Sequence, residues 1–184
     1  ERNVEADTRL VGVRVIILVE NSVRFYSSFL PLIYTETMQQ TSALLSESIN
    51  SANRLLRMRA RPKILLAENF EEATRLVGKY KKYLLGVVSD IQYSKKGEIN
   101  PTAGIQLARR IRKKLSDLPI LLQSSDESNR KKSYKVGAGF LYKRSPKLLT
   151  ELSKFIYNNF GFGDFVFRLP DGTELDRARN FKEL

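Results

Sequence analysis

Asp90 is the residue best placed to do chemistry. It ends the apolar run at residues 84–89, and a polar stretch containing Gly and Pro follows it. Such a run is typical of a buried parallel strand, and open α/β sheets bind ligands at the carboxyl ends of their strands. Further polar groups also follow apolar runs: Glu20-Asn21, Ser124 and Lys143. Carboxylates beside a hydroxyl and an ammonium can bind and accept a phosphoryl group.

The elements that must position these groups alternate along the chain. Short apolar runs predict five strands, at residues 14–19, 63–67, 84–89, 119–123 and 140–142. Helical spacing predicts helices at residues 23–59, 69–80, 101–115, 127–136 and 146–160. This alternation predicts an α/β fold, a parallel sheet covered by helices on both faces. In the doubly wound flavodoxin-like order 2-1-3-4-5, strands one and three are neighbours, which places Glu20 and Asn21 beside Asp90.

Three regions depart from the simple alternation. The first helix is unusually long, and Pro31 inside it is expected to kink it or to start a second helix. Part of so long a helix should project or pack on another chain. After the last helix, the pattern from Phe165 to Leu175 around Asp171-Gly172 predicts a C-terminal β-hairpin. We expect a linker from a preceding region at 1–13, a domain at 14–160 with an elongated helix at 22–60, and a hairpin that starts a following region at 161–184.

Composition excludes several functional classes. The 184 residues are 42% hydrophobic and 28% charged, which is typical of a globular domain with a real core. The sequence has neither Cys nor His, so disulfides, thiolate or His-ligated metal sites and Ser-His-Asp catalysis are excluded. No apolar stretch approaches the ~20 residues that a membrane-spanning helix needs. We therefore expect no membrane association.

The net charge of +12 raises the question of an anionic partner. Two basic clusters stand out, Arg109 to Lys114 without Ile111, and residues 130–132 with Lys135. Each lies in a helical pattern whose apolar positions fall on the opposite face, which favours a solvated helix face. A nucleic-acid surface is the less favoured alternative, because the sequence has no helix-turn-helix, zinc-finger spacing or RNP-type aromatic motif.

Taken together, the motifs resemble the receiver domain of two-component response regulators. The matching stretches are IILVEN at 16–21, GVVSDI at 86–91, AGIQLARRIR at 103–112, LPILLQSS at 118–125 and VGAGFLYK at 136–143. The resemblance covers about residues 14–160, with each motif on the matching element. It implies a regulatory domain of a phosphorelay rather than an enzyme.

The resemblance also implies a role for each site residue. Asp90 would be the phosphoacceptor, with Lys143 and Ser124 as the lysine and hydroxyl that bind the phosphoryl oxygens. Phe140 would be the aromatic residue that changes rotamer on signalling. Glu20, Asn21, Asp90 and the backbone of Gln92 would hold Mg²⁺. The phosphodonor would be a sensor histidine kinase or a phosphotransfer protein, and the domain would act in the cytoplasm.

Two departures from the family pattern leave alternatives open. Asn21 stands where the family has a directly ligating Asp, so Mg²⁺ should bind more weakly. The loop after Asp90 is long, since Gly104 stands fourteen positions after it, and Ser94 replaces a proline often found there. An active phosphoacceptor and a degenerate pseudo-receiver, acting as an interaction or dimerisation module through the long helix, both remain open. Taken singly, the residues also have plainer roles: Asp90 and Ser124 can cap helices, and Phe140 can be core.

The flanking segments carry a second resemblance. VRFYSSFLPLIYTE at 23–36, RMRARPKILLAE at 57–68 and NFGFGDFVFRLPDG at 159–172 resemble large bacterial proteins related to phosphoenolpyruvate synthase and pyruvate phosphate dikinase. Those proteins carry receiver-like regions ahead of their phosphotransfer domains. The resemblance implies that the chain is a piece of such a protein, with the attached domains as partners. It does not make this piece an enzyme, because the sequence has no ATP-grasp or phospho-His element.

Overall fold

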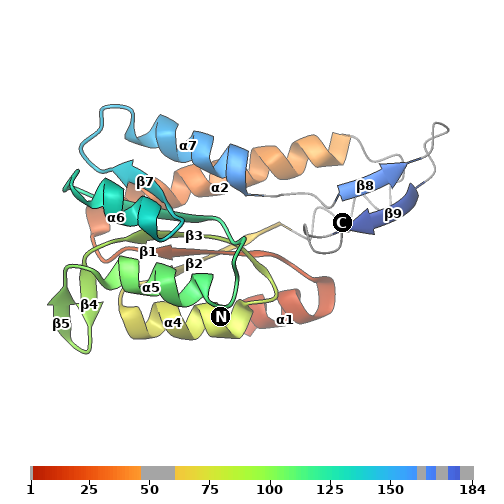
Figure 1. The fold of residues 1–184 in the computed structure, drawn as a ribbon. Helices are drawn as coiled ribbons and strands as arrows, with labels where there is room; N and C mark the ends of the chain where they lie inside the picture. Colours follow the sequence, from red (N-terminus) through yellow and green to blue (C-terminus); the bar gives the residue numbers. More distant parts are fainter. Residues whose placement is uncertain (1, 47–60, 161–164, 169–173, 179–184) are drawn as a thin grey trace.

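A five-stranded parallel sheet forms the centre of the fold (Figure 1). The computed structural model describes residues 2–46, 61–160, 165–168 and 174–178. The sheet strands run in the order β2-β1-β3-β6-β7. Their bounds are Val15–Val19 for β1, Lys63–Ala67 for β2, Leu84–Asp90 for β3, Ile120–Ser124 for β6 and Gly139–Tyr142 for β7. Numbered by sheet strand alone, this is the predicted order 2-1-3-4-5, so the doubly wound flavodoxin-like prediction is confirmed.

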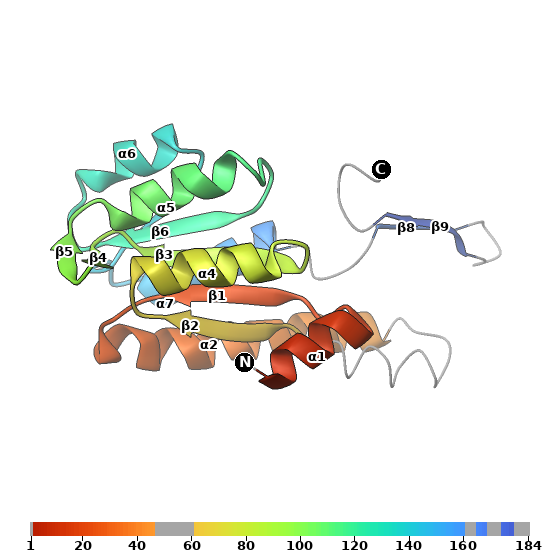
Figure 2. The ribbon, with the colours of Figure 1, turned by 90° about the horizontal axis from the view of Figure 1, so that it is seen from below.

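Helices cover both faces of the sheet (Figures 1 and 2). One face carries α2 (Val23–Ser46) and α7 (Leu148–Asn159), and the other carries α4 (Phe70–Tyr80), α5 (Ala103–Arg112) and α6 (Asn129–Lys135). Successive strand residues point to opposite faces, so β1 serves two apolar cores. Ile16 and Leu18 pack with Phe29 of α2, whereas Ile17 and Val19 pack in the core that includes helices α4 and α5.

The stretch before β1, predicted as a linker from a preceding region, forms a helix. Helix α1 spans Arg2–Val11, and Val4 packs against the core beneath α4 and α5. Two ion pairs join this helix to the domain: Glu5 Oε2 lies 2.9 Å from Lys79 Nζ, and Asp7 Oδ2 lies 3.1 Å from Lys63 Nζ. The sequence did not predict this helix, because most of its residues are charged or polar and give little apolar periodicity.

Helix α2 continues through Pro31 for 24 residues without starting a second helix. Pro31 is exposed, and its missing N–H removes a single hydrogen bond from the helix. The helix continues on both sides of it. Phe29 and Ile33 are fully buried on its inner side. The remainder of the predicted long helix, residues 47–60, lies outside the described residues. Among the described helices, none has both the length and the apolar character needed to cross a membrane.

Two hairpins accompany the main sheet. Antiparallel β8 (Phe165–Arg168) and β9 (Glu174–Ala178) confirm the predicted C-terminal pairing, while the Asp171-Gly172 turn lies outside the described residues. The sequence reading missed β4 (Tyr93–Lys95) and β5 (Glu98–Asn100), which form a hairpin in the long loop after Asp90. Lys96 and Gly97 have φ values of 55° and 84°, the left-handed conformation that two-residue hairpin turns require.

Candidate functional site

Four polar side chains gather at the carboxyl edge of the sheet. Glu20 follows β1, Asp90 ends β3, Gln123 lies in β6 and Lys143 follows β7. Val19 pairs with Ser89, and Asp90 pairs with Gln123. Because paired residues in a parallel sheet point to the same face, Glu20, Asp90 and Gln123 form one row on the face that carries α2. The fold therefore brings residues far apart in sequence into one site.

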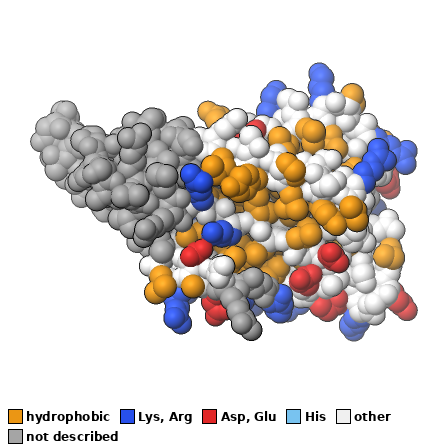
Figure 3. Space-filling view, turned by 180° about the vertical axis from the view of Figure 1, so that it is seen from behind, with side chains coloured by type: hydrophobic (Ala, Val, Ile, Leu, Met, Phe, Trp, Pro, Cys, Tyr) orange, Lys and Arg blue, Asp and Glu red, His pale blue; other side chains and the backbone are white. Residues whose placement is uncertain are grey.

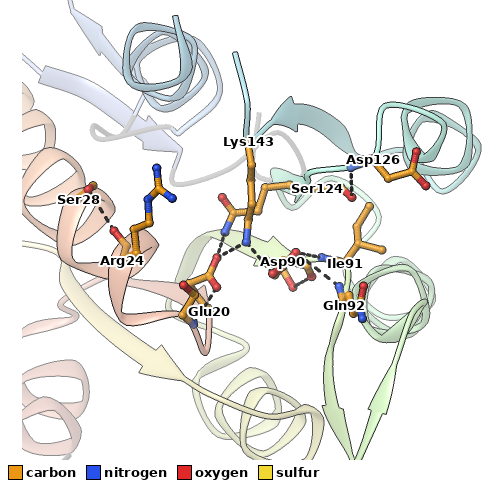
Figure 4. A network of polar contacts seen from close by, with 12 residues as sticks. Glu20, Arg24, Ser28, Asp90, Ile91, Gln92, Ser124, Asp126 and Lys143 are labelled. Atoms are coloured by element: carbon orange, nitrogen blue, oxygen red, sulfur yellow. Dashed lines mark hydrogen bonds and ion pairs between the residues drawn. The ribbon is translucent and has the colours of Figure 1, made fainter. Parts of the chain in front are cut away.

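Lys143 joins the two carboxylates of this row. Its ammonium nitrogen lies 2.6 Å from Glu20 Oε2 and 2.6 Å from Asp90 Oδ2 (Figure 4). The exposed fractions of the side chains are 4% for Lys143, 0% for Glu20 and 13% for Asp90. Buried charges are tolerated when they are paired and hydrogen-bonded. Two carboxylates and one ammonium leave the cluster with one net negative charge, and Asp90 is its most accessible acid.

Glu20 is buried but well supplied with donors. The backbone N–H of Ser22 donates to Oε1 at 3.0 Å, and the Gln123 amide donates to Oε2 at 2.9 Å, beside the Lys143 contact. Burial raises the pKa of Glu20, the charge of Lys143 opposes that rise, and the charge of Asp90 adds to it. The carboxylate thus depends on its hydrogen-bond donors to remain charged away from water.

Asp90 is held by the chain that follows it. Its Oδ1 accepts from the backbone N–H of Ile91 at 2.7 Å and, more weakly, from that of Gln92 at 3.5 Å. Gly104 of α5 donates its N–H to the Ile91 carbonyl at 3.0 Å. A Cβ at position 104 would lie 2.2 Å from the Asp90 carbonyl oxygen, so only glycine allows this close packing. Oδ2 of Asp90 remains directed at Lys143.

Phe25 belongs to the site although the sequence reading missed it. The Lys143 nitrogen lies 4.2 Å from the centre of its ring, a distance at which a cation is attracted to the aromatic face. Phe25 in turn stacks on Phe29, with ring centres 5.9 Å apart. Its place in the first turn of the helix after Glu20 was the available signal, but an aromatic residue there reads equally well as core.

Two predicted site residues lie nearby without contacting Asp90 in the described structure. The Ser124 hydroxyl accepts hydrogen bonds from the Asp126 backbone N–H and the Asn129 side-chain amide, both at 3.1 Å. Figure 4 shows this hydroxyl directed towards Asp126 rather than Asp90. Phe140 is half-buried on the opposite face of the sheet, where the Arg130 guanidinium lies 4.8 Å from its ring centre. Both residues therefore adjoin α6.

The oxygen donors at this edge fit a magnesium ion in kind. Glu20 and Asp90 offer carboxylates, and Asn21 is exposed and offers an amide oxygen. However, Lys143 contacts both carboxylates, and Glu20 has two further donors on its oxygens. Within the described part of the chain, no three acidic, His or Cys residues cluster in a way that could hold a metal. The site thus offers Mg²⁺ oxygen ligands of a suitable kind, but their negative charge is low because Lys143 contacts both carboxylates and Asn21 is neutral.

Solved structures of response regulators share this architecture. A receiver-domain protein from Clostridium thermocellum is 17% identical with a TM-score of 0.55, covering 80% of this chain and 94% of that protein. A DNA-binding response regulator from Staphylococcus aureus is 16% identical with a TM-score of 0.52, covering 79% and 97%. A chemotaxis response regulator from Vibrio cholerae is 18% identical with a TM-score of 0.50, covering 78% and 98%. The chain has the receiver fold.

At these identities the likeness extends to the fold alone. No protein-family model matches the sequence. No curated protein matches it either. Nothing in these similarities supports the resemblance of the flanking segments to phosphoenolpyruvate synthase and pyruvate phosphate dikinase, which stays a prediction. The receiver fold nevertheless accounts for the position of the site, because its carboxyl edge is where Glu20, Asp90 and Lys143 meet.

Proposed function

We propose that this chain is a regulatory receiver domain in which Asp90 accepts a phosphoryl group. The observation that carries the proposal is the Lys143 ammonium 2.6 Å from Asp90 Oδ2, at the carboxyl edge of a receiver-type sheet. Phosphoryl transfer to a carboxylate needs positioning and charge neutralisation more than covalent help from the protein. An accessible aspartate beside a fixed cation offers both.

The proposed reaction is a displacement at phosphorus. With acetyl phosphate as donor, an Asp90 carboxylate oxygen attacks phosphorus, the bond from phosphorus to the acetyl oxygen breaks, and acetate leaves with the electron pair. Lys143 stays beside the new acyl phosphate and balances part of its charge. Glu20, Asn21, Asp90 and the backbone of Gln92 would hold Mg²⁺, which would supply further positive charge beside the phosphoryl oxygens. The missing carboxylate at Asn21 implies weak metal affinity.

The proposed output runs through α6. Ser124 would leave its contacts with Asp126 and Asn129 and donate its hydroxyl to a phosphoryl oxygen. Because those contacts hold the loop into α6, their loss would free the surface around Phe140 and Arg130 to rearrange. A sensor histidine kinase or phosphotransfer protein would supply the phosphoryl group in the cytoplasm. Attached domains, which in the second resemblance belong to a phosphotransferase, would respond, and the domain itself would be regulatory rather than enzymatic.

Beryllofluoride, which mimics a phosphoryl group on aspartate, tests the site directly. The chain has no Trp, so binding is followed by NMR on ¹⁵N-labelled protein with and without Mg²⁺. We expect saturable shifts near Asp90, Ser124 and Phe140 that disappear in Asp90→Asn. Shifts that persist in Asp90→Asn, or none up to saturating Mg²⁺, would count against an acceptor at Asp90.

A degenerate receiver that dimerises is the second candidate function. Asn21 weakens the metal site, and hydrophobic side chains gather on the side of the molecule seen from behind in Figure 3. Val23 and Tyr34 of α2 are 65% and 56% exposed, and Tyr26 and Leu30 are half-buried beside them. A second copy packed on this face would bury them. Sedimentation should then show a dimer that survives both Mg²⁺ removal and Asp90→Asn, whereas a monomer at high concentration excludes it.

Nucleic-acid binding is the least favoured function. Arg109, Arg110, Lys113 and Lys114 are exposed on or just after α5, as are Lys131, Lys132 and Lys135 on α6, while both helices bury their other face. Binding through these charges would weaken steeply with added salt. No binding of a labelled oligonucleotide at ~50 mM salt, where such contacts are strong, would exclude it.

A further inference from the structure

Gln123 is a buried polar residue in a strand that is otherwise apolar up to its last residue. It follows Ile120, Leu121 and Leu122 in β6 and is 0% exposed. Nothing in its position requires a polar group for the sheet itself, since the backbone forms the β-ladder. An apolar side chain of similar size would fill the same space at lower desolvation cost.

The Gln123 side chain reaches across the strand that carries Asp90. Its amide nitrogen donates to Glu20 Oε2 at 2.9 Å, yet β3 lies between β6 and β1 in the sheet. Two strand spacings amount to about 9.6 Å between backbones, so the contact needs both long side chains extended over the strand that carries Asp90. The hydrogen bond therefore passes beside the acceptor residue.

Gln123 and Lys143 share one oxygen of Glu20. The amide lies 2.9 Å and the ammonium 2.6 Å from Oε2, while Ser22 holds Oε1. Glu20 is thereby fixed at both oxygens, and Lys143 is fixed between Glu20 and Asp90. Removing the amide would leave Oε2 of Glu20 held by Lys143 alone, so the carboxylate could turn about its last bond and shift the ammonium relative to Asp90.

The oxygen end of the amide has no hydrogen-bond partner among the described residues. Gln123 Oε1 is buried, and within the described part of the chain no donor reaches it. A half-satisfied buried amide costs free energy of folding. Among the described residues, the hydrogen bond to Glu20 is thus the polar contact that explains a glutamine at this position.

We propose that Gln123 is a positioning residue that holds Glu20, and through it the Lys143 ammonium, against Asp90. The inference rests on the proposed function for its kinetic consequence, but the geometric claim can be tested without phosphorylation. The matched variants are Gln123→Met, which keeps length and removes the donor, and Leu121→Met, a buried change on the same strand and face without a polar contact to the site.

The first readout is the NMR signal of the Lys143 side-chain ammonium, identified by its loss in Lys143→Met. A buried ammonium bound by two carboxylates exchanges slowly and should be visible in the unmodified protein. We expect it to shift or vanish in Gln123→Met and to stay unchanged in Leu121→Met. An unchanged signal in Gln123→Met, or no protected signal in the unmodified protein, would overturn the proposal.

The second readout is the rate of modification by acetyl phosphate. Loss of the amide should slow it about tenfold, because small misplacements of a catalytic group are costly. In a Glu20→Gln background, Gln123→Met should change the rate less than about twofold, since the amide acts through Glu20. If the rate losses of Glu20→Gln and Gln123→Met multiply in the double variant, the two residues act independently and the proposal is overturned. If the unmodified protein is never phosphorylated, the proposed function fails, and the ammonium signal alone decides the role of Gln123.

Discussion

The ammonium nitrogen of Lys143 lies 2.6 Å from Asp90 Oδ2. The Asp90 side chain is 13% exposed, so a phosphodonor can reach the site through this carboxylate. The same nitrogen lies 2.6 Å from the fully buried Glu20 carboxylate. One cation therefore balances two acids, of which Asp90 is the more accessible. A phosphoryl group arriving at Asp90 would meet a positive charge already in place.

Lys143→Met should destabilise the domain strongly. Without the ammonium, the carboxylates of Glu20 and Asp90 would face each other with little access to water. Removing one partner of a buried ion pair typically costs about 3–5 kcal/mol. Lys147→Met is the control, because Lys147 is exposed in the following segment and its loss should change stability by less than about 0.5 kcal/mol. Urea unfolding at neutral pH measures both variants, and equal stabilities would show that Lys143 carries no buried charge pair.

Gly104→Ala should be costly where Gly78→Ala is favourable. A Cβ at position 104 would lie 2.2 Å from the Asp90 carbonyl oxygen and 2.9 Å from Ile91 Cα, neither of which can rotate away. We expect a loss of about 1–3 kcal/mol from overpacking.

Gly78 provides the matched control within helix α4, where an added Cβ meets nothing within 4 Å. Replacing this exposed helical glycine by alanine should stabilise the domain by about 0.5–1 kcal/mol. Thermal unfolding measures both changes: the melting temperature should fall in Gly104→Ala and rise in Gly78→Ala. If Gly104→Ala raises the melting temperature as Gly78→Ala does, α5 does not pack on the acceptor segment as described.

Asn21→Asp should strengthen Mg²⁺ binding. The change adds a carboxylate beside Glu20 and Asp90, and a divalent ion ~4 Å from a new charge gains about 2 kcal/mol even at the dielectric constant of water. Calorimetry should therefore show affinity at least about tenfold higher. Asn158→Asp on the exposed end of α7 adds the same charge away from the site and should leave affinity unchanged. Equal gains from both would mean that the ion does not bind near Asn21.

The loop from Ser124 to α6 should carry an acid-sensitive contact. Asp126 accepts hydrogen bonds from the hydroxyl and the backbone N–H of Ser128, and these lower the pKa of Asp126 below its ordinary 3.8. A folded-state pKa below the unfolded value means that the contact stabilises the fold above pH 3.8 and is lost as pH falls through the folded pKa. Ser128→Ala should raise the pKa of Asp126 towards 3.8, measured by NMR titration of its carboxyl carbon. No change would show that the Ser128 hydroxyl does not hold Asp126.

Local sequence patterns predicted the strands and helices of the fold, but they did not predict the contacts between residues far apart in the sequence. Strand β2 lies at the predicted residues 63–67 because a short leucine-rich run between helical patterns admits few other structures. Lys143 was predicted as a site residue, but its contact with Glu20 spans four strands, and sequence spacing does not encode such a distance.

Gln123 and Ser124 show why the remaining site details were missed. Gln123 was read as the end of a strand, since a single polar residue after three apolar ones gives no sign of its partner. Ser124 was expected near the phosphoryl group, yet its hydroxyl bonds to the backbone two residues on, a local contact typical of serine. The hairpin after Asp90 was missed because its strands are three residues long.

The measurement that tests the central claim most directly is the intact mass of the protein after incubation with acetyl phosphate and Mg²⁺. An acceptor at Asp90 predicts the addition of a single phosphoryl group, its absence in Asp90→Asn, and its slow loss in buffer as the acyl phosphate hydrolyses. An unmodified mass in the native protein, or an adduct that persists in Asp90→Asn, would contradict the account.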